Sequence, residues 1–291
     1  MKHELNFYTG NHFDFGISDQ LNYCNIRLRE DFQFKLLKTI PSEGFFLCIE
    51  NFNRPFTRTV NSQNSKLGVV LTELMELNKS GYLEINSRTI LAKRTYIVDM
   101  QRRFFELVKC LPKIDFFVTL FGSPRVQVVK EVFPQIPIYN LCLWPNFTIM
   151  IPDKFEYDYS FFGTITPHRK KILDQLKKTN SVIVKHGISE TERAILMEKS
   201  KFVLNIPQDT KWGSISPMRV ISSHEAGRFT VNLGTSSNSL PGVIDVINLS
   251  ELAHIDTLGN KKTVKIETYN KKISKYDEAR ALKTHLEMRQ N

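Results

Sequence analysis

Short apolar runs alternate with amphipathic segments through the second half of the chain. The predicted strands cover residues 159–163, 181–185, 202–206, 229–233 and 243–249, and the predicted helices cover 167–178, 189–200 and a segment that begins near Ser216-Pro217 and is closed by Gly227. Strand, loop, helix and strand in repeated order is typical of an open parallel sheet. Ligands bind such sheets at the carboxyl ends of their strands, so the loops that leave those ends are the first candidates for chemistry.

The first half is less regular. Residues 1–44 show no clear period, and residues 65–77 hold a short apolar run that fits a strand followed by a helix. Asn51 to Pro55 is predicted to be a polar turn. The clearer predictions are strands at 44–50, 114–121 and 138–143, and helices at 101–111 and 124–132.

The residue pattern changes at Trp144, and we place the boundary between two lobes there. The following stretch, WPNFTIMIPDKFEYDY, carries two prolines and no helical period, which indicates an extended connection. We therefore predict an α/β protein with two Rossmann-like lobes, residues 1–145 and residues 146–291. The second lobe includes a charged C-terminal helix at 273–288, which could also return to support the first lobe.

Composition limits the class of protein. A chain of 291 residues is long enough for two domains of about 100–200 residues each. It contains no apolar run of about 18 residues and no signal-peptide pattern at its start, so we expect a cytoplasmic protein. The four cysteines form no C-x-x-C pair and are expected to be reduced thiols, with zinc or disulfides as the alternative.

The formal net charge is +10, so the surface should attract anions. Nucleic acid, anionic lipid headgroups and phosphorylated small molecules all fit this charge. The charge alone does not choose among them.

The loop that leaves the predicted strand 159–163 is a candidate anion site. Gly163 and Thr164 lead into a helix that carries Arg169 and Lys170, so backbone N–H groups, the helix dipole and two cations converge. Neither a P-loop nor a G-x-G-x-x-G motif is present. The alternative for Arg169 and Lys170 is an ordinary solvated helix face.

Arg219 is the candidate for binding a diphosphate. It lies in the first turn of the helix that follows Ser216, where a planar guanidinium and hydroxyl donors suit phosphate oxygens. The alternative is a salt bridge to Glu225 or to a neighbouring helix. Candidates for the nucleoside follow neighbouring predicted strands or the next loop: His186, Gly187, Asn205 and Trp212. Each of these could instead be a cap, a turn or a core residue.

A general base would come from the first half. His12 and Asp14 lie in an aromatic, loop-like segment, and Glu50 ends a predicted strand. Surface or structural roles are the alternative for all three. No His, Asp, Glu or Cys cluster has the spacing of a metal site, so we expect no metal or other bound cofactor.

Residues 157–250 resemble the nucleotide-binding lobe of the GT-B glycosyltransferases, most closely the CgeB-like group. The matching pieces are F-x-G before an arginine-bearing helix, His-Gly after a strand, K-hydrophobic-L-N at 201–205, and S-P-M-R ending at Arg219, eight residues before Gly227. The chain departs from the family at Ser214 and Ser222, which stand where paired glutamates are common. Donor identity and stereochemistry are therefore open, with Glu225 as a displaced substitute.

The resemblance implies two lobes facing a cleft and transfer of a sugar from a nucleotide-diphosphate sugar to a hydroxyl, without a metal. Arg219 would neutralise the leaving diphosphate, assisted by Arg169 and Lys170. A surface glycan or lipid-linked saccharide is the expected acceptor, with peripheral contact to an anionic membrane. Two alternatives stay open: a phage-type enzyme that glycosylates modified bases in DNA, and a non-catalytic relative that binds a nucleotide or serves in an assembly.

Overall fold

The computed structural model describes much of the chain. The described residues are 3–10, 32–50, 52–71, 95–119, 129–140, 148–207, 215–234, 242–246, 249–255, 263–265 and 278–290. The chain divides into two compact units. The first comprises residues 1–142 and 276–291, and the second comprises residues 143–275.

The first unit is built on a parallel sheet of six strands. In chain order they are β1 (His3–Tyr8), β2 (Phe32–Leu37), β3 (Phe45–Ile49), β4 (Lys66–Leu71), β5 (Ile114–Thr119) and β6 (Ile138–Asn140). The order in the sheet is β2-β1-β3-β4-β5-β6, and the pairs are all parallel. The helices of this unit that the structure describes include α2 (Arg54–Ser62), α4 (Thr95–Lys109), the short η1 (Leu111–Lys113) and α11 (Glu278–Gln290).

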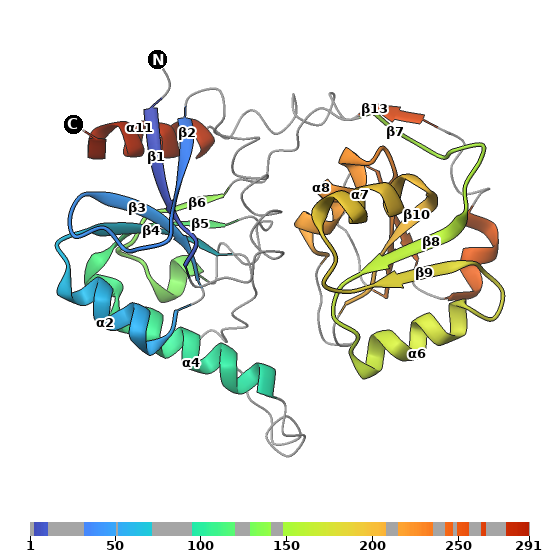
Figure 1. The fold of residues 1–291 in the computed structure, drawn as a ribbon, viewed down its shortest axis with the longest axis horizontal. Helices are drawn as coiled ribbons and strands as arrows, with labels where there is room; N and C mark the ends of the chain where they lie inside the picture. The colour runs from blue at the N-terminus through green and yellow to red at the C-terminus, as the bar shows by residue number, and fades with distance from the viewer. Residues whose placement is uncertain are drawn as a thin grey trace. The chain divides into compact units, whose positions relative to one another are not determined.

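Alternation along the strands divides the core of this unit between the two faces of the sheet. Phe46 and Phe117 point to the face covered by α2 and α4, where they pack in one buried cluster with Phe56. On the other face Gly68 lies against Phe116, and a Cβ added at this glycine would stand 2.5 Å from the ring. A side chain at position 68 would therefore require the Phe116 and Leu47 side chains on the two paired strands to move. Figure 1 shows α2 and α4 on one side of the sheet and α11 on the other.

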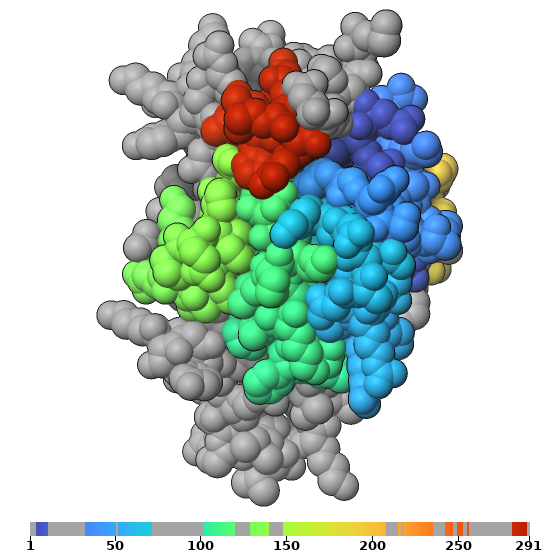
Figure 2. Space-filling view, turned by 90° about the vertical axis from the view of Figure 1, so that its left-hand side faces the viewer, coloured from blue at the N-terminus to red at the C-terminus, as the bar shows by residue number. Residues whose placement is uncertain are grey.

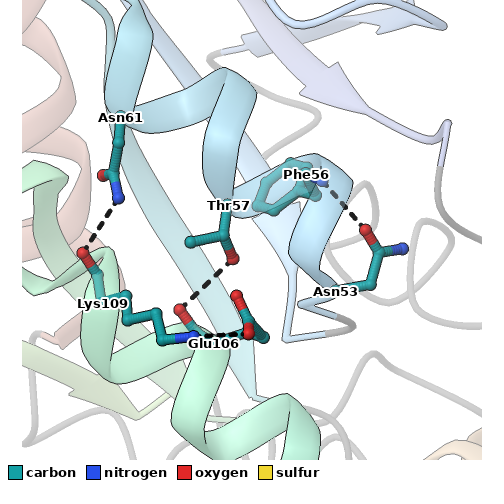
Figure 3. Close-up of polar contacts among 6 residues, drawn as sticks. All are labelled: Asn53, Phe56, Thr57, Asn61, Glu106 and Lys109. Atoms are coloured by element: carbon teal, nitrogen blue, oxygen red, sulfur yellow. Dashed lines mark hydrogen bonds and ion pairs between the residues drawn. The ribbon is translucent and has the colours of Figure 1, made fainter.

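Polar contacts join α2 to α4 (Figure 3). The Thr57 hydroxyl donates to the main-chain oxygen of Glu106 at 3.4 Å, and Asn61 donates to that of Lys109 at 3.2 Å. The Lys109 ammonium, 2.7 Å from the Glu106 carboxylate, lowers the pKa of that carboxyl by hydrogen bonding. Asn53 caps α2 by accepting from the Phe56 N–H at 2.9 Å. The stretch predicted to be a polar turn is thus the start of a helix, with Asn53 as its N-cap and a proline in its first turn.

The helix α11 packs against the first unit, although its position in the sequence follows the second. Its Leu282 and Leu286 are each 1% exposed. Tyr139 on β6 lies 2.8 Å, hydroxyl to Nδ1, from His285, and the Arg289 guanidinium lies 3.0 Å from the Asp115 carboxylate. Figure 2 shows α11, in red, against the blue and green surface of this unit. The boundary predicted near residue 145 grouped this helix with the second lobe; the burial of its apolar face places it with the first.

The second unit holds a parallel sheet of five strands. They are β8 (Tyr157–Phe162), β9 (Val182–Lys185), β10 (Ser200–Asn205), β11 (Phe229–Leu233) and β12 (Val243–Val246), in the order β12-β11-β10-β8-β9. Among the described residues of this unit the helices are α6 (Pro167–Leu176), α7 (Glu190–Glu198), α8 (Pro217–Glu225) and the short η2 (Leu249–His254). The strand β7 (Thr148–Met150) pairs antiparallel with β13 (Thr263–Lys265). The predicted α/β class with Rossmann-like parallel sheets is confirmed.

Both sheets reverse their winding direction once. The chain moves outward from β1 to β2 and then returns past β1 to β3; in the same way it moves from β8 to β9 and returns to β10. Figure 1 shows the result in the second unit, where α6 covers one face of the sheet and α7 and α8 cover the other. The point of reversal, here called the switch point, lies at the carboxyl ends of two neighbouring strands whose next connections cover opposite faces of the sheet, and sheets of this kind bind ligands at that point. In the second unit these strands are β8 and β10.

The described helices are short and carry charged side chains. The longest, α4, spans 15 residues and carries several charged side chains. Across the residues described above, no helix combines the length and the apolar character needed to cross a lipid bilayer.

Candidate functional site

Arg219 joins the two strand ends at the switch point of the second unit. Its Nη1 donates to Oδ1 of Asn205 at 2.6 Å, and its Nη2 donates to the main-chain oxygen of Phe162 at 3.3 Å. Phe162 is the last residue of β8 and Asn205 the last of β10. The sequence prediction that Arg219 and Asn205 contribute to one site therefore has a geometric basis, since a single guanidinium connects them.

Arg169 makes a second connection between the same two strand ends. Its side chain is almost fully buried, with the residue 5% exposed. Its Nε donates to the main-chain oxygen of Ile206, just beyond β10, and its Nη1 to that of Thr164, just beyond β8, both at 2.9 Å. These contacts give Arg169 a definite role in holding the loop after β8 against β10. The predicted contact of this residue with an anion stays a prediction.

The two guanidinium groups pack against one aromatic ring. The central carbon of each lies 5.3 Å from the centroid of the Phe161 ring, a distance at which cation–π attraction operates. Gly163 leaves the space for them: a Cβ at this position would stand 3.1 Å from Nη2 of Arg219 and 3.7 Å from Nη1 of Arg169. Its φ of +147° is also one that a residue with a side chain rarely adopts. The strand end thus presents two adjacent positive charges, which makes it attractive to an anion.

The N-terminus of α8 lies at the same place. Ser216 is the N-cap of this helix, and its N–H is 3.5 Å from Oδ1 of Asn205. Within the described part of the chain, the Ser216 side chain makes no capping hydrogen bond, and the first turn of α8 has no acidic residue. By contrast, α6 is capped by Thr166, whose hydroxyl accepts from the Arg169 N–H at 3.2 Å. The start of α8 is therefore the better of the two helix ends for binding a phosphate.

A row of polar side chains continues from Arg219 across the sheet. Asn205 donates through Nδ2 to Oδ1 of Asn232 at 2.8 Å, and Asn232 donates through Nδ2 to a carboxylate oxygen of Asp245 at 2.7 Å. The three residues are directly paired in the register of β10, β11 and β12. Asn205 is 1% exposed and Asn232 is fully buried. We did not predict Asn232 or Asp245 from the sequence, although an asparagine inside the apolar run FTVNL signals a buried amide that needs partners.

Three predicted residues lie at the same sheet edge and are exposed. Thr164 follows β8, and His186 and Gly187 follow β9, the neighbour of β8. The Gly163 N–H donates to the main-chain oxygen of Lys185 at 3.2 Å, which holds the two loops together. A Cβ added at Gly187 would meet no atom within 4 Å. The sheet edge is therefore open at Gly187.

Two other predicted residues lie apart from this group. Lys170 is exposed on α6 and forms an ion pair with Asp174 one turn later, as on the solvated helix face given as its alternative. Glu225 is exposed and is the last residue of α8, the end that leads into the start of β11. Because α8 runs from the carboxyl edge of the sheet to its amino edge, Glu225 lies at the opposite edge from Asn205.

Next to Glu225, His224 is a buried structural histidine. It is 1% exposed, and its Nε2 lies 3.4 Å from the main-chain oxygen of Gly242 at the start of β12. Burial lowers the pKa of this histidine from 6.5 to about 4. It is therefore neutral at physiological pH and holds α8 to β12.

Of the predicted general bases, only Glu50 lies within the described residues. It follows β3, is 4% exposed, and its N–H donates to the main-chain oxygen of Val70 at 3.2 Å. The strand that it follows is paired with β1, and these two strands form the switch point of the first sheet. His12, Asp14 and Trp212 lie outside the described residues. In the described ranges, His, Cys, Asp and Glu side chains form no group of three or more that could hold a metal ion.

Comparison with known proteins leaves the family open. No protein-family model matches the chain, and no curated protein matches it in sequence. The resemblance to the CgeB-like glycosyltransferases therefore stays a prediction. The site itself consists of a parallel sheet whose switch point carries two arginines and the start of a helix.

Proposed function

We propose that this protein is a glycosyltransferase that moves a sugar from a nucleotide-diphosphate sugar to a hydroxyl acceptor. In this proposal the arrangement is GT-B-like: the second unit binds the donor and the first binds the acceptor. One observation carries the proposal: Arg219 and the start of α8 meet at the switch point between β8 and β10. This is the position at which doubly wound sheets bind nucleotides.

The proposed chemistry follows from the charge that develops in the reaction. When the bond between the sugar and the diphosphate breaks, the departing diphosphate gains negative charge. Arg219 offers a planar pair of N–H donors to its oxygens, and the first N–H groups of α8 add the positive end of the helix dipole. Because these groups are already held in place, they stabilise the transition state without reorganisation. This supports transfer that does not depend on a metal ion.

The remaining parts of the substrate are assigned by position. The open edge at His186 and Gly187 is the proposed place of the nucleoside. Glu50, at the switch point of the first sheet, is the proposed base that accepts the proton of the attacking hydroxyl. A glycan or lipid-linked saccharide is the proposed acceptor class.

The proposal is tested by ligand binding followed by turnover. Thermal unfolding is measured with uridine, guanosine, cytidine and thymidine diphosphates, their sugar conjugates and the matching monophosphates. At least one diphosphate should raise the midpoint of unfolding more than its monophosphate does, because a ligand of the folded state stabilises it. The sugar conjugate that binds should then be hydrolysed slowly in the absence of an acceptor. Failure of every diphosphate to stabilise the protein would overturn the proposal.

The class of acceptor is tested separately, by comparing binding to two kinds of anionic surface. Binding is measured at low and moderate salt to duplex DNA and to vesicles that contain anionic lipid. Preferential binding to vesicles supports the saccharide acceptor. Tight, steeply salt-dependent binding to DNA, with sugar transfer to its modified bases, would replace it with a nucleic-acid acceptor.

A further inference from the structure

The direction of the hydrogen bonds that connect Arg219 to Asp245 is fixed from both ends. A guanidinium can only donate and a carboxylate can only accept, whereas an amide does both. Asn205 therefore turns its oxygen toward Arg219 and its nitrogen toward Asn232, which in turn donates to Asp245. Flipping both amides would place donor against donor at Arg219 and acceptor against acceptor at Asp245. Each buried amide has one satisfied orientation.

The group that holds Arg219 in this row is a neutral oxygen. A carboxylate at position 205 would also bind the guanidinium, but it would put a full negative charge 2.6 Å from it. In the protein the carboxylate of the row stands two side chains farther away, at Asp245 on β12. Because β12 ends the sheet order and Asp245 is exposed, that charge faces solvent.

We propose that Asn205, Asn232 and Asp245 are positioning residues that orient Arg219 for a diphosphate through a neutral acceptor and keep the negative charge of the row away from it. Asp245 sets the direction of the Asn232 amide, Asn232 sets that of Asn205, and Asn205 presents its oxygen to Arg219. The inference rests on the proposed function, since it concerns how the same site selects an anion.

The test is an exchange of the two ends of the row in a double variant, Asn205→Asp with Asp245→Asn. The net charge is unchanged, the two hydrogen bonds among residues 205, 232 and 245 can form in the reverse direction, and Arg219 remains a donor to residue 205. The new amide at position 245 donates to Asn232, and both Asn232 and Arg219 donate to the new carboxylate at position 205. If the row of side chains serves only to stabilise the fold, the double variant should therefore keep that role. Affinity for inorganic pyrophosphate and for nucleoside diphosphates is measured by calorimetry at fixed ionic strength, together with urea unfolding.

The double variant should unfold at a urea concentration close to that of the parent and bind pyrophosphate at least about tenfold more weakly, because like charges now face each other across the site. The matched control is Glu156→Gln with Asn180→Asp, which makes the same two exchanges at the amino edge of this sheet. Glu156 precedes β8 and pairs with Lys199, and Asn180 precedes β9. The control should bind pyrophosphate as the parent does.

A second variant keeps the inference testable if the exchange prevents folding. Asp245→Ala removes only an exposed side chain, so folding should persist, but the Asn232 and Asn205 amides lose their fixed end. Their side-chain NH₂ signals in ¹H–¹⁵N spectra should shift or double, and pyrophosphate affinity should fall severalfold.

The outcomes separate the two proposals. A parent protein that binds neither pyrophosphate nor any nucleoside diphosphate overturns the proposed function, and this inference with it. A parent that binds, together with a folded exchange variant or an Asp245→Ala variant of equal affinity, overturns this inference alone and leaves the proposed function standing.

Discussion

Arg169 and Arg219 both join the end of β8 to the end of β10, and they do so through different kinds of acceptor. Arg169 donates to two main-chain oxygens, those of Thr164 and Ile206. Arg219 donates to one main-chain oxygen and to the side chain of Asn205. The first pattern fixes the backbone, whereas the second connects the strand ends to the side-chain row Asn205, Asn232 and Asp245. Substitutions of the two arginines should therefore have different effects.

Arg219→Ala should weaken binding of nucleoside diphosphates by at least about tenfold, since a hydrogen bond to a charged group contributes about 1.5–3 kcal/mol. Arg219→Lys should be intermediate, because an ammonium supplies charge without the planar pair of donors. Calorimetric titration with a diphosphate measures both. Lys178→Ala, an exposed substitution beyond α6, is the control and should bind as the parent does. Equal affinity in Arg219→Ala would remove this residue from the site.

Arg169→Met should lower the free energy of unfolding of the second unit by about 2–4 kcal/mol, because the buried carbonyl of Ile206 and the partly buried carbonyl of Thr164 lose a charged donor. Urea unfolding followed by tryptophan fluorescence measures this directly, since Trp144 and Trp212 are the two tryptophans and both belong to residues 143–275. The exposed Lys171→Met on the same helix should change the free energy by less than about 0.5 kcal/mol. Unaltered stability in Arg169→Met would show that the loop is held by other contacts.

His224 should make stability depend on pH below neutrality. Its pKa is lowered by burial to about 4 in the folded protein, against 6.5 when exposed. The unfolded chain therefore binds the proton more readily, so this contribution is fully present above pH 6.5 and is lost as the pH falls from 6.5 to 4. The loss amounts to roughly 3 kcal/mol. Urea unfolding across this range should show a steeper fall in the parent than in His224→Phe; parallel curves would contradict the assignment.

Leu286→Ala should lower the free energy of unfolding of the first unit by about 2–4 kcal/mol, because it leaves a cavity under α11. Hydrogen exchange at β5 and β6 amides should accelerate, while the tryptophan transition of the second unit should keep its midpoint. Met288→Ala, two residues away and 66% exposed, is the control. Protection of β6 that is the same in both variants would mean that α11 contributes little to this unit.

The second half of the fold could be predicted because its strands and helices follow one another at short intervals. The strands β8 to β11 fall within about two residues of their predicted ranges. The sequence does not reveal the strand order, because pairing depends on contacts between distant segments. β1 and β2 were not predicted: in β1 a mixture of polar and aromatic residues obscures the alternation of the buried Leu5 and Phe7, and β2 lies at the edge of the sheet with polar residues outward.

Arg219 could be predicted from the sequence as a residue of the candidate site, whereas the residues that hold it in place could not. A cation in the first turn of a helix that follows a buried strand indicates an anion site, and Arg219 lies where that rule places it. Asn232 and Asp245 were not predicted because only the strand register places them next to Asn205. The contact of Phe161 with the two arginines was not predicted because a phenylalanine in an apolar strand is expected in any core. Arg169 could not be distinguished from Lys170 until burial separated them.

The return of α11 to the first unit makes that unit discontinuous in sequence. The chain leaves it after β6, completes residues 143–275, and comes back to cover Tyr139 on the same strand. Before the second unit folds, bringing α11 to β6 means closing a long flexible loop, which carries an entropic cost; a folded second unit shortens the flexible part of that loop. During synthesis β6 is made well before the helix that covers it. Folding of the second unit should therefore accelerate completion of the first, and a ligand that binds at Arg219 would act on both.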